Sequence, residues 1–410
     1  MASYSQDEFV CGACFNDDGL KEFVSAHAGE NECSFCGAVS DEPIAAPIDE
    51  VIDYIGECIG RYYDDPANTL PYESAEGGYQ GTTYTTEEVL EAVELDFPND
   101  HQSRLYDAVC SGLPNDLWSD AEPFALSRDE QLSFSWEEFC RVIKHERRYF
   151  FAQRKPGKDS ELYSPSEILR LIFSYADEAG AFVQLPRSTK LYRARQQAEG
   201  ESLTTAGKLG PPPVECAIQA NRMSPPGIVM MYASEDEQTA LAETAMTTGT
   251  YAIGEFVTER DALILDFTRL PSIPSIFTEL SDALEYDPRP RLGFLHRVSR
   301  EMSRSIARDD RMHIEYVPTQ VVTEYIRTVL TTGKGAVEGI RYRSSRKDGE
   351  TSLVLFADQH NLILEKEEQP EFYFLWKDCW LRLTTASSKT ISNNDIEAWT
   401  QKNGCLFPDF

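Results

Sequence analysis

Two cysteine pairs near the N-terminus have the spacing of a metal site. Two residues separate Cys11 from Cys14 and Cys33 from Cys36, and eighteen residues lie between the pairs. A two-residue gap lets both thiolates of one turn reach the same ion, and four thiolates complete the coordination of a structural zinc. The spacing therefore predicts a structural zinc site with no open position for chemistry. A site in which His27 replaces one thiolate, and a set of unrelated free thiols, are the alternatives.

Several common catalytic loops are missing from the sequence. It contains no G-x-S-x-G elbow and no G-x-G-x-x-G fingerprint, and Gly333-Lys334-Gly335 lacks the remaining residues of a Walker A loop. The sequence therefore shows no motif for a redox cofactor bound on a Rossmann sheet.

The composition limits the number of domains and the kind of partner. A chain of 410 residues exceeds one typical core, so two or three domains are expected. The formal net charge is −31, and residues 41–100 contain 16 acidic residues against one basic residue, Arg61. This surface repels phosphate, and no cluster of lysines or arginines offers a basic face. A nucleic-acid partner is therefore not expected.

The sequence also bears on location. No apolar run reaches the roughly 20 residues that span a bilayer, and the first residues lack the basic and apolar regions of a secretion signal. We expect no membrane association and a cytoplasmic protein, in which the ten cysteines would stay reduced.

The pattern of elements divides this multidomain chain into four parts. Residues 1–40 would form a small zinc ribbon or knuckle with four cysteine ligands, and residues 41–185 show the apolar spacing of an α-helical domain. Thr85 or Thr86, and Ser164, precede acidic residues in the way that helix caps do. The glycine-containing stretch 72–86 predicts a loop.

Strands and helices mix after residue 185. Residues 186–368 are therefore predicted to form an α/β (α+β) domain. Ser234 and Glu237 predict a capping box at the start of one of its helices. The aromatic-rich tail, residues 369–410, is expected to pack on this domain or on a second subunit. The expected strands are 227–233, 251–256, 262–266, 337–342 and 352–357, and the expected helices are 235–246 and 319–331.

Six short segments of this domain occur in the order that a known family shows. They are Lys190–Arg195, Asn221–Gly227, Met231–Ser234, Thr239–Glu243, Tyr316–Gln320 and Gly339–Ser345. From about residue 188 to 365 the chain resembles the RES family, which is named for an Arg, a Glu and a Ser. These correspond to Arg193, Glu243 and Ser344, and Arg222 and Tyr232 fall on two further positions that the family uses.

The resemblance implies that NAD is the substrate and that the bond between nicotinamide and ribose is cleaved, on a fold similar to that of ADP-ribosyltransferases. Loss of nicotinamide leaves a cationic sugar. A carboxylate near the sugar and cations at the phosphates would therefore stabilise the transition state most. Glu243 would supply the carboxylate. Arg193 and Arg222 would hold the pyrophosphate with their planar guanidinium groups.

The other two positions would orient the substrate. Tyr232 would stack on nicotinamide or bind ribose through its hydroxyl. Ser344 would orient the amide or a phosphate, and its neighbour Ser345 could take the same part. The expected catalytic residues are Glu243, Arg193, Ser344 and Tyr232, and the expected substrate-binding residues are Arg193, Arg222, Tyr232 and Ser344.

These features favour an NAD-degrading toxin or antiphage defence effector, acting as a glycohydrolase or a phosphorylase. The alternatives are a mono-ADP-ribosyltransferase that modifies a macromolecule and a catalytically inert interaction module.

The zinc-plus-helix segment resembles an N-terminal domain that is often fused to RES domains and is grouped with the HEPN superfamily. Many HEPN ribonucleases use an Arg and a His separated by four to six residues, whereas Arg141 and His145 are separated by three. A scaffold is therefore expected. Because short RES proteins are restrained by an antitoxin, an antitoxin or regulatory protein is an expected partner. The N-terminal domains could restrain the RES domain in cis or build a homo-oligomer.

Overall fold

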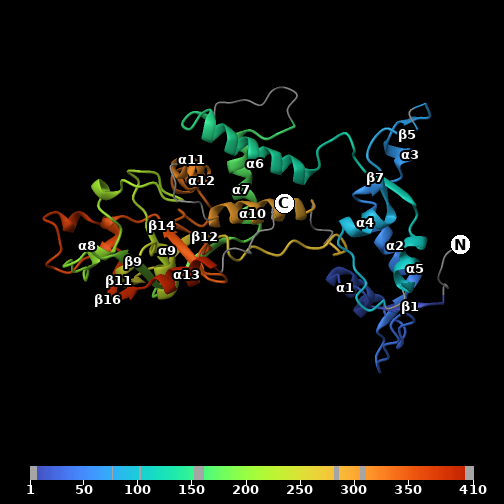
Figure 1. Cartoon of the computed structure of the whole chain (residues 1–410), viewed down its shortest axis with the longest axis horizontal. Helices are drawn as coiled ribbons and strands as arrows, with labels where there is room; N and C mark the ends of the chain where they lie inside the picture. The colour runs from blue at the N-terminus through green and yellow to red at the C-terminus, as the bar shows by residue number, and fades with distance from the viewer. Residues whose placement is uncertain are drawn as a thin grey trace. The chain divides into compact units, whose positions relative to one another are not determined.

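The computed structural model describes residues 7–75, 77–100, 103–151, 161–280, 286–304 and 311–401. The chain forms two compact units (Figure 1). Unit 1 contains residues 1–130 and 272–290, and unit 2 contains residues 131–271 and 291–410. Within the described ranges, no helix is both long and apolar enough to cross a membrane.

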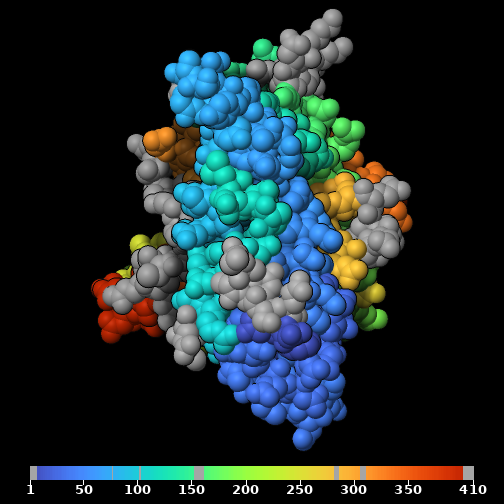
Figure 2. Space-filling view, turned by 90° about the vertical axis from the view of Figure 1, so that its right-hand side faces the viewer, coloured from blue at the N-terminus to red at the C-terminus, as the bar shows by residue number. Residues whose placement is uncertain are grey.

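Unit 1 has one apolar core surrounded by short elements. Strand β1 pairs antiparallel with β2, and β3, β7 and β6 form a three-stranded sheet. The helices bury the residues that recur at three- and four-residue intervals, such as Val51, Ile52 and Ile55. Its main elements are β1 (Phe9–Cys11), α1 (Asp18–His27), β2 (Ala45–Pro47), α2 (Ile48–Ile59), β3 (Tyr63–Asp64), α3 (Pro66–Thr69), β6 (Tyr84–Thr85), α4 (Thr86–Ala92), α5 (Arg104–Gly112) and β7 (Leu117–Asp120). Figure 2 shows one face of this unit, on which its blue-to-cyan atoms form a continuous surface.

The predicted loop over residues 72–86 is more ordered than the sequence indicates. It contains the two-residue strands β4 (Tyr72–Glu73) and β5 (Gly78–Tyr79), which pair antiparallel, and it ends in β6. The rings of Tyr72 and Tyr79 meet edge to face across the β4–β5 pair, 5.1 Å apart. Cross-strand aromatic contacts of this kind stabilise a hairpin despite nearby glycines.

A segment from much later in the chain completes the core of unit 1. Phe277 is buried there, and the Tyr54 hydroxyl donates to its carbonyl over 2.7 Å. Arg289 donates to several carbonyls of the same segment, including those of Ser275 and Ile276. The described residues of this segment, 272–280 and 286–290, therefore fold with the N-terminal elements.

Unit 2 contains a nine-stranded mixed sheet. Its order is β15-β16-β11-β9-β10-β14-β13-β12-β8, and the β15–β16 and β12–β13 pairs are parallel. The strands are β8 (Phe182–Leu185), β9 (Lys190–Gln196), β10 (Met231–Ser234), β11 (Gly249–Thr258), β12 (Ala262–Asp266), β13 (Gly339–Arg343), β14 (Thr351–Leu355), β15 (Leu362–Ile363) and β16 (Leu381–Ile391).

Both faces of this sheet are covered. Along β12, Leu263 and Leu265 point into a core shared with α6, α7, α10 and α12, whereas Ala262 and Ile264 face a second core that includes α8. This alternation follows from the two-residue period of a strand. The helices are α6 (Arg128–His145), α7 (Pro165–Glu178), α8 (Ala206–Leu209), α9 (Glu237–Thr244), α10 (Arg289–Ser303), α11 (Met312–Glu315), α12 (Val317–Thr328) and α13 (Asn393–Gln401).

Two parts of the chain join unit 2 from outside the region 186–368. Helices α6 and α7, which the sequence placed in the helical segment 41–185, contribute to the core on one face of the sheet. The tail adds β16, which pairs with β11, and Trp380 is buried beside it. Residues 402–410 of the predicted tail lie outside the described residues.

Candidate active site

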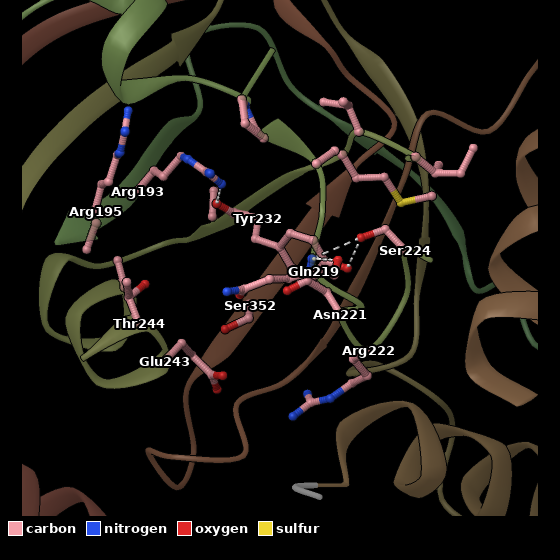
Figure 3. A pocket seen from close by; sticks show the side chains of 18 of the residues that line it. Arg193, Arg195, Gln219, Asn221, Arg222, Ser224, Tyr232, Glu243, Thr244 and Ser352 are labelled. Carbon is pink, nitrogen blue, oxygen red and sulfur yellow. Dashed lines mark hydrogen bonds between the residues drawn. The ribbon is translucent and has the colours of Figure 1, made fainter. Parts of the chain in front are cut away.

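Unit 2 contains a cavity of about 840 Å³ to which four of the predicted residues contribute (Figure 3). Arg193, Arg222, Tyr232 and Glu243 all line it. Ser344 does not line it, but its hydroxyl contacts Glu243. The structure thus brings together residues that are up to 151 positions apart in the sequence, from Arg193 to Ser344.

Neighbouring elements hold these side chains in place. Arg193 lies on β9, and Tyr232 lies on the adjacent strand β10. Glu243 belongs to α9, which follows β10 after a short turn. Arg222 lies in the loop before β10, and Ser344 directly follows β13.

The predicted capping box at the start of α9 is wrong. The N-cap is Asp236, whose Oδ1 accepts from the backbone N–H of Thr239 over 2.9 Å. Ser234 instead stays in β10, where it pairs with Ser352 of β14, and the two hydroxyls are 3.2 Å apart. Sheet pairing therefore outcompetes the local cap, and the helix begins at Glu237.

Two hydrogen bonds fix the Glu243 carboxylate. Its Oε1 accepts from the Ser344 hydroxyl at 2.6 Å and from the backbone N–H of Ser345 at 2.9 Å. The Ser344 oxygen also accepts from the backbone N–H groups of Arg346 and Lys347. The β13–β14 loop therefore holds one carboxylate oxygen of Glu243. The hydrogen bonds from Ser344 and Ser345 both end on Oε1 and leave Oε2 unused.

Arg222 lies on the same side of the cavity as Glu243. Its Nη2 donates to the Ser345 hydroxyl over 2.9 Å, and its guanidinium carbon lies 5.4 Å from the centre of the Tyr342 ring. Figure 3 shows the Arg222 side chain directed toward the Glu243 side of the cavity. The Nε and Nη1 atoms of Arg222 are buried and have no hydrogen-bond partner among the described residues.

The guanidinium group of Arg193 is held by one hydrogen bond among the described residues. Its Nη1 donates to the Tyr232 carbonyl over 3.0 Å, while its buried Nε has no partner among the described residues. Burial, with the nearby charge of Arg195, lowers the pKa of Arg193 to about 10. The group therefore stays cationic at neutral pH without an acidic partner among the described residues, and it favours an anionic ligand.

The Tyr232 hydroxyl is already engaged. It accepts from the backbone N–H of Met223 over 3.2 Å and lies 3.0 Å from the Ser224 hydroxyl. Burial raises the pKa of Tyr232, so the phenol stays neutral. These contacts tie the loop that carries Arg222 (the Arg222 loop) to β10. They leave the ring as the part of Tyr232 that can stack on a ligand.

Two further residues shape the site through the backbone. On α12, the Thr319 hydroxyl donates to the carbonyl of Arg222, and Gln320 Nε2 donates to the carbonyl of Asn221 over 2.8 Å. Both residues are buried. The sequence contained the signal, because Tyr316–Gln320 is one of the ordered segments, but it did not reveal that these side chains bind main-chain atoms.

The four cysteines of the predicted zinc site form one cluster in unit 1. Their Sγ atoms all lie within 4.8 Å of one another, with Cys11–Cys36 at 3.5 Å and Cys14–Cys33 at 3.7 Å. Four thiolates at about 2.3 Å from a tetrahedral zinc lie about 3.8 Å apart. The cluster therefore fits zinc. His27 is not needed, since its ring contacts Phe23 and the Phe23 carbonyl.

Comparison with known families matches two parts of the chain. The model of HEPN/RES N-terminal domain 1 matches residues 26–157, and the model of the RES domain matches residues 190–377. No curated protein and no solved structure matches the chain.

Proposed function

Because the chain belongs to the RES family, with a HEPN/RES N-terminal domain ahead of its RES domain, we propose that it degrades NAD⁺ by cleaving the bond between nicotinamide and ribose. A RES domain indicates a toxin-type function related to NAD. The finer assignment, to a glycohydrolase or phosphorylase that serves as a toxin or defence effector, rests on the chemistry of the cavity.

One observation carries the proposal: a carboxylate and two incompletely paired guanidinium groups line a single cavity. Buried N–H groups of Arg193 and Arg222 lack partners among the described residues, which is costly unless a ligand supplies acceptors. Phosphate oxygens suit planar guanidinium groups. The volume of about 840 Å³ lies in the range of sites for small molecules and cofactors.

Glu243 would act on the sugar. Departure of nicotinamide places positive charge on the ribose, and a carboxylate already held in position stabilises that charge without reorganising. Since Ser344 and Ser345 hold Oε1, Oε2 is the oxygen that remains for the ribose or for the attacking nucleophile. The Tyr232 ring would stack on the substrate.

The test compares nicotinamide release from NAD⁺ by the wild type, Glu243→Gln and Glu237→Gln. Glu237 lies in the first turn of the same helix but does not line the cavity, so it is a matched control. We expect Glu243→Gln to lose roughly 100- to 1,000-fold in kcat, the scale of losing one charge-stabilising group, and Glu237→Gln to stay near wild type. Equal rates for all three, or no release by the wild type, would reject the proposal.

The products separate the possible nucleophiles. Assays with and without inorganic phosphate distinguish hydrolysis from phosphorolysis. Labelled NAD⁺ with a macromolecular fraction reports a mono-ADP-ribosyltransferase, for which the label must appear on the acceptor.

We also propose that Cys11, Cys14, Cys33 and Cys36 hold one structural zinc. Metal analysis of purified protein should find about one zinc per chain, the number that one four-cysteine site holds. The Cys14→Ser variant should lose the zinc, and the unfolding midpoint of unit 1 should fall because zinc binding contributes directly to folding. Cys216→Ser is the control, since Cys216 is exposed in unit 2. Zinc retained in full by Cys14→Ser would contradict the assignment.

A further inference from the structure

The last strand of unit 2 has an open edge. On one side, β16 pairs with β11 along its length, from Gly249↔Ile391 to Thr258↔Leu381. On the other side, β15 pairs only with Leu381 and Arg382. From Leu383 onward, no described strand pairs with this side of β16.

The side chains along this edge are exposed as well. Residues 384–390 are exposed on both faces of the strand, whereas residues 251–254 of the neighbouring β11 are buried on both faces. A register irregularity between Glu255 and Phe256 of β11 falls opposite the start of this stretch. Residues 385–391 therefore form a regular strand of seven residues whose outer edge no described strand covers.

The composition of the edge suits a second strand. Edge strands that must avoid pairing usually carry charges, proline or bulges. Residues 385–391 consist of Thr, Ala, Ser and Ile with a single charge, Lys389, in a chain whose net charge is −31. On an acidic molecule this is a surface where a second copy can approach with little repulsion.

We propose that β16 is the interface of a homodimer, in which the same strand of a second copy pairs with it antiparallel across a two-fold axis. A symmetric pairing of residues 385–391 is centred on Ser388. It places Lys389 of one copy opposite Ser387 of the other, so the two lysines are not directly opposed. Each copy supplies the backbone donors and acceptors that the other lacks, as in other cases of strand addition. The proposal does not depend on NAD⁺ cleavage, because the cavity is lined within a single chain.

The test replaces Ser388, at the centre of the pairing, by a negatively charged residue in one variant and by a positively charged residue in another. Across an antiparallel pair, directly opposed side chains are neighbours, and like charges there are destabilising. Light scattering coupled to size exclusion should give the wild type the mass of a dimer, which is two chains of 46.3 kDa each. Ser388→Glu and Ser388→Lys should each shift toward the monomer, with a dissociation constant raised about tenfold or more, the factor that 1.4 kcal/mol gives.

Mixing the two variants supplies the control for folding. If both variants are correctly folded, a Glu on one chain opposite a Lys on the other should restore a dimer that contains one chain of each variant. Chains that carry different tags will reveal this mixed dimer. A monomeric wild type, variants that dimerise as well as the wild type, or a mixture that stays monomeric would each overturn the proposal.

Discussion

Among individual residues, Ser344 shows how the structure refines a role inferred from the sequence. The sequence placed Ser344 at the substrate, with Ser345 as the alternative. In the structure the Ser344 hydroxyl donates to Glu243 and accepts from two backbone N–H groups, so its hydrogen-bonding capacity is occupied. Ser345 contacts two site residues with different atoms: its N–H donates to Glu243, and its hydroxyl accepts from Arg222. Spacing alone could not separate these parts, because they depend on the conformation of the β13–β14 loop.

This division predicts different kinetic effects for two adjacent serines. Ser344→Ala removes a hydrogen bond to the carboxylate, so kcat for NAD⁺ cleavage should fall roughly 10- to 100-fold with little change in KM, as expected for a bond to a charged group. Ser345→Ala keeps its N–H but frees Arg222, so KM should rise instead. Steady-state kinetics of both variants, with Ser344→Thr as the variant that keeps the hydroxyl, checks the split. If both alanines changed kcat and KM alike, the separate roles would be wrong.

At the scale of elements, local signals identified many helices and strands of the chain, but β9, which carries Arg193, and β16 of the tail were not among the expected strands. Helices α4 and α7 begin with the capping boxes that Thr85 and Ser164 predict, and the expected strands 251–256 and 262–266 lie within β11 and β12. One error arises where tertiary pairing competes with local preference. Ser234 is an adequate cap by itself, but β10 extends through it to pair with β14.

Helix α12 gives a prediction at this scale, because it holds the Arg222 loop through side chains. Replacing Thr319 by Val keeps the shape but leaves the Arg222 carbonyl without its donor. The loop should loosen, and KM for NAD⁺ should rise about tenfold, which corresponds to one buried hydrogen bond of about 1.4 kcal/mol, while kcat stays within about twofold. Thr319→Ser keeps the hydroxyl and should behave like the wild type. An unchanged KM in Thr319→Val would show that the Arg222 loop is held by its other contacts.

For the whole molecule, the units do not follow the order of the sequence. Residues 272–290 come between β12 and most of α10 but belong to the core of unit 1. No periodicity or composition in this stretch marks it as part of an N-terminal core. Burial of Phe277 and the Arg289 contacts are long-range facts that appear only when distant segments are packed together. A truncated protein that begins at residue 131 would lack the rest of this core and expose Phe277.

A glycine in α1 provides a test of this arrangement. A Cβ added at Gly19 would lie 2.6 Å from the backbone carbon and oxygen of Phe277 and from the amide nitrogen of Thr278, and backbone atoms cannot move aside cheaply. Within a helix, Gly→Ala normally stabilises by about 1 kcal/mol, but here the overlap should outweigh that gain and destabilise unit 1 by about 1–3 kcal/mol. Gly29→Ala is the control, since a Cβ there meets nothing within 4 Å.

The measurement is denaturant unfolding of the full chain, followed by a signal from unit 1. The transition of Gly19→Ala should move to lower denaturant, whereas that of Gly29→Ala should stay near wild type. A Gly19→Ala protein as stable as the wild type, or more stable, would mean that helix propensity dominates. That outcome would contradict the close approach of Phe277 and Thr278 to α1, because the expected loss of stability depends on that backbone contact.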